Sequence, residues 1–360
     1  MSNNRVLLTV SGIIPADIEA LIASGDRPRV DYFEMASAFG ADIADYKRSR
    51  AGLGRLGRLV KRIAGDSVML AWHCFRCRHG YDIVVTDGEQ VGLPLAAMMR
   101  LSRRIALPRH VMIVHVMSVP KKEMLYRCLR LGSRIDQMVL YSSAQRDFVV
   151  FRLGFPAEKT KLSSFMVDTR FFSPSPSAGG SRPPLICSAG LEFRDYPTLL
   201  AAIDGLDVRV VLAAASTWSK RSNELDGLKL PENVEVVRLD LHQLRDLYAS
   251  SDVIVMPLRE VDFQAGVTTL LEAMAMQKPI ICSRTVGQTD VIDDGITGLY
   301  VEPGNVAELR AAILSLLDDS RRAQDLGTAA RRWVESTADI DVYVERLTAW
   351  VAEQARASRT

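Results

Sequence analysis

The stretch that decides the fold is SDVIVMPLREVDFQAGVTTLLEAMAMQKPIICSRTVGQTDVIDDGITGLYVEPGN, residues 251–305. Its apolar start, 252–258, predicts a buried parallel strand. After a polar loop, small and hydroxyl residues precede the apolar run LLEAMA, which predicts a helix that begins near Gly266. The free N–H groups at the start of such a helix form a phosphate site. On these residues alone, an ordinary helix capped by threonine explains the pattern equally well.

Short apolar runs of the same kind recur along the whole chain, with helical segments of about 10–15 residues between them. This alternation predicts an α/β fold with two Rossmann-like parallel-sheet domains that face an interdomain cleft. We expect strands at 5–10, 81–86, 110–115 and 137–142, and then at 184–190, 208–214, 234–239, 252–258 and 279–283.

A stretch rich in Pro, Gly and Ser, SPSPSAGGSRPP, divides the chain near its middle and is typical of a linker. We expect an N-terminal domain over 1–172, the linker over 173–184 and a second domain over 185–340. Residues 341–360 show helical spacing of apolar residues and form a last helix that can pack back on the N-terminal domain.

The composition, 48% hydrophobic and 24% charged over 360 residues, is that of a globular protein and excludes intrinsic disorder. No apolar run approaches the roughly 20 residues of a membrane-spanning helix. Residues 1–175 contain 26 Lys and Arg against 16 Asp and Glu, so this half is basic and the rest is acidic. Because no aromatic platform accompanies the basic charge, we expect no binding of nucleic acid.

Five scattered cysteines in a chain without a signal peptide predict a reducing, cytoplasmic location. The segment HCFRCRH, 73–79, holds four possible metal ligands. A structural zinc site usually takes a second ligand pair from elsewhere, and this sequence has no second pair of that spacing. We therefore expect no metal here and a helix with two small thiols instead.

The motifs of 251–305 resemble those of the retaining GT-B glycosyltransferases of family four, or group 1. The family has a Glu, seven residues, a second Glu within LLEAMA, then GKP, a Gly-rich turn with an acid, DG-TGLLV and PGD. This chain has LLEAMAMQKPI, GQTDVI and DGITGLYVEPGN in the same order and spacing. YDIVVTDGEQVG and the stretches that follow it resemble the family's N-terminal domain, whereas residues 1–70 match less clearly.

The resemblance implies that the second domain binds a nucleotide-diphosphate sugar without a metal or cofactor. Glu272 corresponds to the Glu that binds the ribose, and Arg194 to a basic residue that neutralises the diphosphate. The nucleotide base is expected near the end of the strand at 234–239. The implied donor-binding residues are Arg194, Arg238, Leu239, Gly266, Val267, Thr268, Thr269 and Glu272.

The chain departs from the family pattern at two positions of this domain. The first Glu, which holds the donor sugar, is replaced by Gln264, an amide that keeps its hydrogen-bonding capacity and loses the charge. Asp262 or Glu260 can supply a carboxylate instead. Leu191 replaces a usual Arg, for which Lys220 or Arg221 can compensate.

In the N-terminal domain, His115 ends the strand at 110–115 and matches the family's His, which hydrogen-bonds the donor sugar. The implied catalytic residues are His115, Gln264 and Glu272. Asp87 and Glu89 follow the strand at 81–86 and are candidates for the acceptor side. The loop after the first strand lacks the family's Gly pair, so the acceptor does not follow from the resemblance.

Residues 47–65, KRSRAGLGRLGRLVKRIAG, are basic without any acid, and their apolar residues recur at roughly helical spacing. Such a helix can lie on anionic lipid at the inner membrane face. A solvated helix that covers the N-terminal sheet explains the same pattern.

The sequence thus predicts a hexosyltransferase that moves a sugar from a nucleotide diphosphate to a glycan, lipid-linked or small-molecule acceptor with retention of configuration. The departing phosphate oxygen takes the acceptor's proton. Two alternatives remain open: a related epimerase or phosphorylase with this fold, and a non-catalytic scaffold that binds nucleotide sugar.

Overall fold

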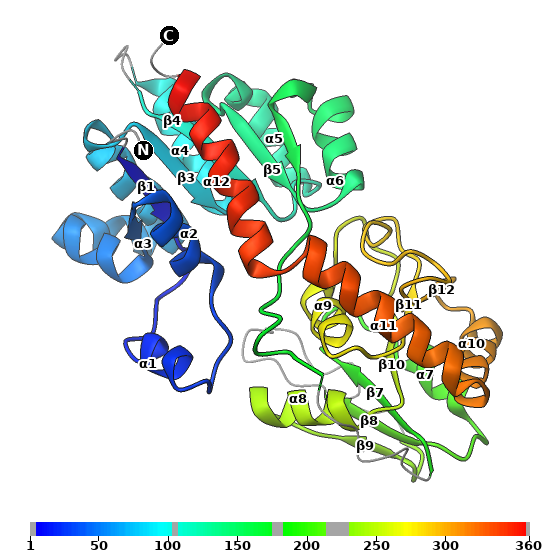
Figure 1. The fold of residues 1–360 in the computed structure, drawn as a ribbon. Helices are drawn as coiled ribbons and strands as arrows, with labels where there is room; N and C mark the ends of the chain where they lie inside the picture. The colour runs from blue at the N-terminus through cyan, green and yellow to red at the C-terminus, as the bar shows by residue number, and fades with distance from the viewer. Residues whose placement is uncertain (1–4, 103–106, 175–182, 214–229, 358–360) are drawn as a thin grey trace. The chain divides into compact units, whose positions relative to one another are not determined.

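A computed structural model describes residues 5–102, 107–174, 183–213 and 230–357 (Figure 1). The chain forms two compact units. Unit 1 consists of Met1–Ala20, Arg29–Ser163 and Asp341–Thr360, and unit 2 consists of Leu21–Pro28 and Ser164–Ile340. No helix within the described residues is long and apolar enough to cross a membrane.

Unit 1 is built on a parallel sheet of six strands in the order β2-β1-β3-β4-β5-β6. Its central strands are short runs of buried aliphatic residues, because helices cover both faces of such a sheet. The strands are β1 Val6–Thr9, β2 Ala41–Ala44, β3 Ile83–Asp87, β4 Arg109–Val114, β5 Gln137–Leu140 and β6 Thr160–Leu162.

The helices of unit 1 lie between these strands, and α12 comes from the C-terminal end of the chain. The longer helices are α2 Asp31–Phe39, α3 Tyr46–Cys77, α4 Glu89–Leu101, α5 Pro120–Cys128 and α12 Ile340–Ala357. The short elements are α6 Ser143–Asp147, η1 Arg78–Gly80, η2 Leu131–Arg134, η3 Phe148–Arg152 and η4 Ala157–Lys159.

Unit 2 repeats the architecture with a second parallel sheet in the order β12-β11-β10-β7-β8-β9. The strands are β7 Leu185–Ala189, β8 Arg209–Ala213, β9 Val234–Val236, β10 Val253–Met256, β11 Ile280–Ser283 and β12 Leu299–Val301. The helices are α1 Ile18–Ala23, which begins in unit 1, α7 Tyr196–Ile203, α8 Leu241–Ser250, α9 Val267–Ala275, α10 Val306–Asp318 and α11 Ser320–Thr337.

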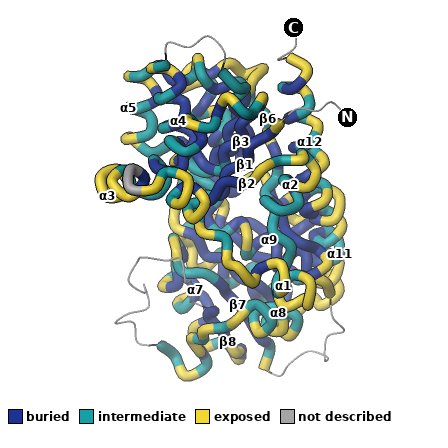
Figure 2. Tube along the Cα trace, turned by 90° about the vertical axis from the view of Figure 1, so that its left-hand side faces the viewer, coloured by how far each residue is buried: buried dark blue, intermediate teal, exposed yellow. Residues whose placement is uncertain are grey.

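The sheet of unit 2 separates two apolar cores. In unit 2 one core packs under α8, α9 and α11, and the other under α7 and α10. Figure 2 shows the central strands of unit 1 as buried and much of α3 as exposed. The predicted fold class, two Rossmann-like parallel-sheet domains, is confirmed by the two six-stranded sheets.

The C-terminal helix α12 packs against unit 1 through polar contacts that β5 and β6 supply. The Tyr141 and Tyr343 hydroxyls lie 2.8 Å apart and are buried. Lys161 of β6 pairs with Glu353 at 2.9 Å. The last helix therefore completes the unit that the start of the chain begins.

The bounds of the units differ from the sequence-based domains at two places. Unit 1 ends at Ser163 and not at 172, because Val167, Phe171 and Phe172 contribute to the core of unit 2. Leu21–Pro28 is assigned to unit 2, where Asp26 lies 3.4 Å from His242 of α8. Of the expected linker, residues 175–182 lie outside the described residues.

The basic segment 47–65 is not one continuous helix. It lies within α3, where Gly54 (φ 55°, ψ −132°) and Gly65 (φ 87°, ψ 173°) adopt non-helical conformations. Only glycine takes such conformations without strain, so the two positions divide the segment. Between them, Leu59 and Ile63, which are 53% and 77% exposed, are one helical turn apart.

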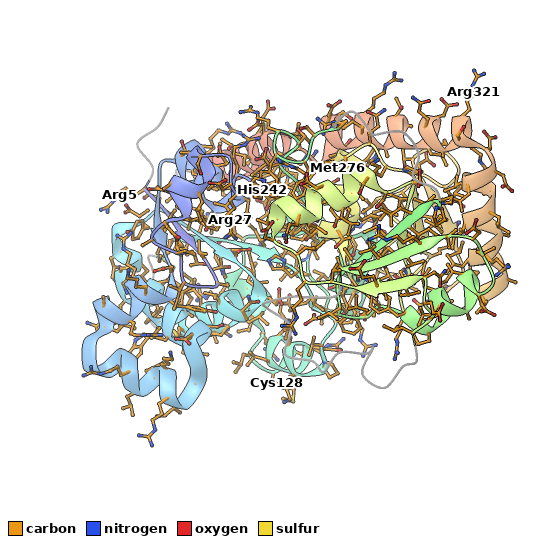
Figure 3. The ribbon with its side chains drawn as sticks, turned by 90° about the horizontal axis from the view of Figure 1, so that it is seen from below. Arg5, Arg27, Cys128, His242, Met276 and Arg321 are labelled. Carbon is orange, nitrogen blue, oxygen red and sulfur yellow. The ribbon has the colours of Figure 1, made fainter. Side chains whose placement is uncertain are left out.

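The five cysteines are all free thiols. Cys74, Cys187 and Cys282 are buried, Cys77 is partly buried, and Cys128 is exposed at the end of α5 (Figure 3). Burial raises the pKa of the Cys74 and Cys77 thiols. Among the described residues no three His, Cys, Asp or Glu side chains are grouped so that they could hold a metal ion.

The closest helix packing in unit 2 depends on Gly327 of α11. A Cβ at this position would overlap the backbone of Gln277, at the turn that follows α9. We predict that Gly327→Ala lowers the free energy of unfolding by about 1–3 kcal/mol, the usual cost of overpacking. Gly12→Ala is the matched control, because a Cβ there meets nothing within 4 Å. Equal denaturant midpoints for the two variants would contradict the close approach.

Candidate donor site

The candidate site of unit 2 is formed by the loop that follows β10 and by the first turn of α9. Gly266 adopts the left-handed conformation (φ 71°) that turns the chain into the helix, and no side chain caps the helix. The first intrahelical bond runs from the Leu270 N–H to the Gly266 carbonyl. The amides of the first turn therefore point their positive dipole end at an open position.

Arg194 lies directly at this helix start. A Cβ at Gly190 or at Gly266 would overlap its guanidinium. Because these two residues have no side chain, the backbone can approach the charged group at both positions. Nε donates to the Ala189 carbonyl at 2.9 Å, and Nη1 donates to the Glu192 carbonyl at 3.1 Å. These bonds fix the guanidinium plane.

Arg194 makes no ion pair with a carboxylate among the described residues, although Glu192 interacts with it electrostatically. The Arg194 side chain is only 3% exposed, and burial lowers its pKa. A buried cation without an anion is costly, and here it also faces the positive end of a helix dipole. The arrangement is therefore complementary to an anion that both groups can contact.

Glu272 is buried on α9, one turn beyond Thr268 and Thr269. Its Oε2 accepts a hydrogen bond from the Tyr248 hydroxyl of α8 at 3.1 Å. Burial raises the pKa of Glu272 to about 7, although the bond from Tyr248 opposes this rise. Since Oε2 is held by Tyr248, the carboxylate is oriented before any ligand arrives.

The remaining donor-site residues occupy the expected segments. Val267 and Thr269 are buried or half-buried in the first turn of α9, and Thr268 is exposed. Arg238 is exposed and Leu239 is half-buried between β9 and α8. The compensating cations Lys220 and Arg221 lie outside the described residues.

Gln264 precedes the helix start, and its Oε1 is buried without a hydrogen-bond partner among the described residues. Gln288, from the loop after β11, is fully buried, and its Oε1 also has no hydrogen-bond partner among the described residues. Its Nε2 donates to the Ala265 carbonyl at 3.5 Å. Glu260, weighed as a substitute carboxylate, accepts from the Val286 N–H at 3.0 Å. Two unsatisfied amide oxygens thus come from loops that contact each other.

A second group of candidate residues lies in unit 1, at the carboxyl ends of β3 and β4. His115 Nε2 is 2.9 Å from Asp87 Oδ1. Burial alone would lower the pKa of His115, but the hydrogen bond and charge of Asp87, together with the charges of Glu89 and Asp31, outweigh burial and raise it. Asp31, at the start of α2, interacts electrostatically with both residues, and burial followed by the charge of Asp87 raises its pKa to about 7.

Glu89, a candidate for the acceptor side, is buried in the structure. It is 2% exposed, Oε2 accepts from the His115 backbone N–H at 2.9 Å, and Oε1 pairs with Lys122 at 2.5 Å. Both oxygens are thus used internally, and Glu89 positions His115. Asp87, in contrast, stays partly accessible, with a side chain that is 22% exposed.

Tyr248, Gln288, Lys122 and Asp31 are members of these two groups that sequence reasoning did not find. Tyr248 lies outside the quoted motifs, and Lys122 lies in a stretch that resembles the family's N-terminal domain without being singled out there. Each is recognised only through its partner carboxylate. Gln288 belongs to the quoted GQTDVI motif, which gave the only available signal for it.

The comparisons with known proteins agree with this geometry. Residues 192–319 match the family described as "Glycosyl transferases group 1". These residues include the loop, the helix start and Glu272. This match supports, over these residues, the resemblance that the motifs of 251–305 show to this group.

Among curated proteins, the chain is 28% identical over 320 residues to the GDP-mannose-dependent alpha-(1-6)-phosphatidylinositol monomannoside mannosyltransferase of Mycolicibacterium smegmatis. The match covers 82% of each chain. It is also 28% identical over 210 residues to the MMP alpha-(1->4)-mannosyltransferase of Mycolicibacterium hassiacum, which covers 56% of this chain and 50% of the relative.

Solved structures share the fold. Sucrose-phosphate synthase from Thermosynechococcus elongatus has a TM-score of 0.73 at 15% identity and covers 99% of this chain and 100% of its own. HepE of Anabaena, solved in complex with UDP-glucose, has a TM-score of 0.70 at 15% identity and covers 98% and 100%. The GT-B fold of the chain is confirmed.

The buried carboxyl of Glu272 makes the stability of unit 2 depend on pH. Its pKa is about 7 in the folded chain and about 4.5 when exposed, so the folded state holds the proton more tightly. The stability gained by protonation is present below about pH 4.5 and is lost as the pH rises to about 7. We predict that the free energy of unfolding of wild type falls by up to about 3 kcal/mol, relative to that of Glu272→Gln, as the pH rises between these values.

Urea unfolding of both chains from pH 5 to pH 8 measures this difference. Glu260→Gln, at an exposed carboxyl, should follow wild type across the range. Parallel curves for wild type and Glu272→Gln would show that Glu272 titrates as an ordinary exposed residue.

Proposed function

We propose that this glycosyltransferase transfers mannose from GDP-mannose to a hydroxyl of a glycolipid acceptor, with retention of configuration. The observation that carries the donor site is the buried, carboxylate-free Arg194 at the uncapped start of α9. The choice of GDP-mannose is supported by the relative from Mycolicibacterium smegmatis, which matches 82% of the chain.

In this proposal the diphosphate takes the position between Arg194 and the amides of Val267, Thr268 and Thr269. Arginine and backbone N–H groups are suited to phosphate because each donates a charge-assisted or dipole-assisted hydrogen bond. Glu272, held by Tyr248, accepts hydrogen bonds from the two hydroxyls of the ribose. Gln264 and Gln288 offer their unsatisfied amide oxygens to hydroxyls of the sugar.

The reaction breaks the bond between the anomeric carbon and the diphosphate oxygen and forms a bond from that carbon to the acceptor oxygen. The acceptor attacks from the face that the diphosphate leaves, and its proton passes to the departing phosphate oxygen. Arg194 and the helix start stabilise the charge that develops on this oxygen, and no metal has to take part. In unit 1, His115 orients the sugar, and Asp87 and Glu89 hold His115 in place.

Calorimetric titration with GDP-mannose, UDP-glucose and free GDP tests the donor site. We predict binding of GDP-mannose and GDP by wild type, and a loss of affinity of at least about tenfold in Arg194→Met, since a hydrogen bond to a charged group contributes about 1.5–3 kcal/mol. Arg209→Met removes an exposed arginine of unit 2 and should leave the affinity unchanged.

Release of GDP in the presence of a mannosylated phosphatidylinositol then tests transfer. Binding without turnover would favour the non-catalytic scaffold, whereas product without acceptor or a need for phosphate would favour the epimerase or phosphorylase. Tighter binding of UDP-glucose than of GDP-mannose would overturn the donor assignment.

We also propose that the segment of α3 between Gly54 and Gly65 contacts the membrane that carries the acceptor. Leu59 and Ile63 project into solvent on one side of this segment. Arg58 and Arg62 are exposed beside them, and Lys61 pairs with Asp66 at 3.3 Å. Two apolar side chains flanked by cations are complementary to an anionic lipid surface, where each cation contributes about 1 kcal/mol.

Co-sedimentation with phosphatidylglycerol and phosphatidylcholine vesicles tests this contact. We predict binding to the anionic vesicles, weakened about tenfold or more in the double variant Leu59→Ser, Ile63→Ser, since each buried side chain contributes about 1.5–3 kcal/mol. Ile296→Ser replaces an isoleucine of unit 2 that is 56% exposed and should bind like wild type. Equal binding by the double variant would refute the contact.

A further inference from the structure

A cavity of about 530 Å³ opens in unit 1 at the amino-terminal ends of β3 and β4. The candidate residues Asp87 and His115 lie at the carboxyl ends of the same strands, about 15–20 Å away along a strand of this length. The cavity is therefore separate from the catalytic candidates of its own unit. Its volume is within the range of small-molecule sites.

The lining of this cavity is rich in arginine. Its polar lining includes Arg78, Asp82, Arg109, Ser133, Arg134 and Asp136. Apolar side chains, among them Leu107, line the rest. The formal charge of this set is positive, because it contains three arginines and two aspartates.

The two aspartates are already engaged within the protein. Asp136 pairs through Oδ1 with Arg109 at 2.7 Å and accepts the His110 N–H on Oδ2 at 2.8 Å. Asp82 accepts the backbone N–H of Arg5 at 2.9 Å. Arg5 itself lies over the ring of Tyr81, 5.1 Å from its centroid, so a fourth guanidinium flanks the cavity (Figure 3).

Arg134 carries an unsatisfied donor in this lining. Its Nε is buried and has no hydrogen-bond partner among the described residues, and its guanidinium makes no ion pair there. An unsatisfied buried donor on a cation is costly to the free protein. Arg78 is oriented as well, since its guanidinium stacks 3.9 Å from the centroid of Phe75 and donates to the Phe75 carbonyl.

We propose that this cavity binds a phosphate-bearing small molecule, with the phosphate on Arg134 and Arg78 and the organic part against the apolar lining. Phosphate matches the planar fork of arginine and satisfies the free Nε of Arg134. A bare phosphate is too small for about 530 Å³, so the ligand is a phosphate ester. The site lies outside the donor and acceptor machinery and does not depend on the proposed function.

Calorimetric titration with glycerol 3-phosphate, inorganic phosphate and glycerol tests the site at low salt. We predict saturable binding of glycerol 3-phosphate, weaker binding of inorganic phosphate and none of glycerol. Arg134→Met should weaken the binding of glycerol 3-phosphate by about tenfold or more. Arg76→Met is the matched control, because Arg76 is exposed in the last turn of α3 and does not line the cavity.

Two further measurements separate the possible sources of the phosphate. Vesicles that contain phosphatidic acid compete with glycerol 3-phosphate if a lipid headgroup can enter the cavity, and they leave its binding unchanged if only a free ester fits. Arg134→Met should bind GDP with the affinity of wild type. The two sites are thus tested separately, and a failure of the donor site leaves the result at this cavity unaffected. Absence of saturable phosphate-ester binding, or equal binding by Arg134→Met and wild type, would overturn the proposal.

Discussion

The guanidinium of Arg194 sets the constraint on which the arrangement of unit 2 depends. It is buried at the positive end of α9, and the backbone at Gly190 and Gly266 leaves room for it only because neither residue has a Cβ. Two backbone carbonyls hold the group, and no carboxylate neutralises it within the described residues. A buried charge without an ion-pair partner lowers the stability of the folded chain, and it fits the proposed role of this group in binding the donor diphosphate.

In unit 1, in contrast, the buried carboxylate of Glu89 has an ionic partner within the protein. Lys122, Glu89 and the backbone of His115 form a closed set of contacts, and Asp87 holds the imidazole from the other side. His110, one strand position away from the amino end of β4, is fully buried, and burial lowers its pKa to about 4. The pKa is thus lowered for His110, near the amino end of β4, and raised for His115, which follows its carboxyl end. Only the side chain of His115 has a carboxylate partner.

Sequence periodicity was sufficient for the interior strands of both sheets and missed three of the four edge strands. The nine expected strands, among them the edge strand β9, are all present, with ends that shift by at most three residues. The three strands that were not expected, β2, β6 and β12, are edge strands of three or four residues. An edge strand pairs on one side only and is less apolar, as ADIA and TKL show, so the pattern that marks a buried parallel strand is absent.

The candidate site residues also fall into those that the sequence pointed to and those that only the fold shows. The motif resemblance pointed to Arg194, Gly266 and Glu272, whereas the residues alone left an ordinary capped helix equally open. The partners Tyr248 and Lys122 could not be placed from the sequence, because tertiary packing alone brings them to their carboxylates. Glu89 shows the limit most clearly: its position after β3 suggested an exposed carboxylate, and only the fold shows that both of its oxygens are used.

The return of α12 to unit 1 has a consequence for synthesis of the chain. Tyr343, Arg346 and Glu353, which contact β5, β6 and the residue after β6, are made after every residue of unit 2. On the ribosome, unit 2 therefore has its complete sequence first, although it comes second in the chain. Unit 1 waits with the flank of its sheet uncovered until the final helix has left the exit tunnel.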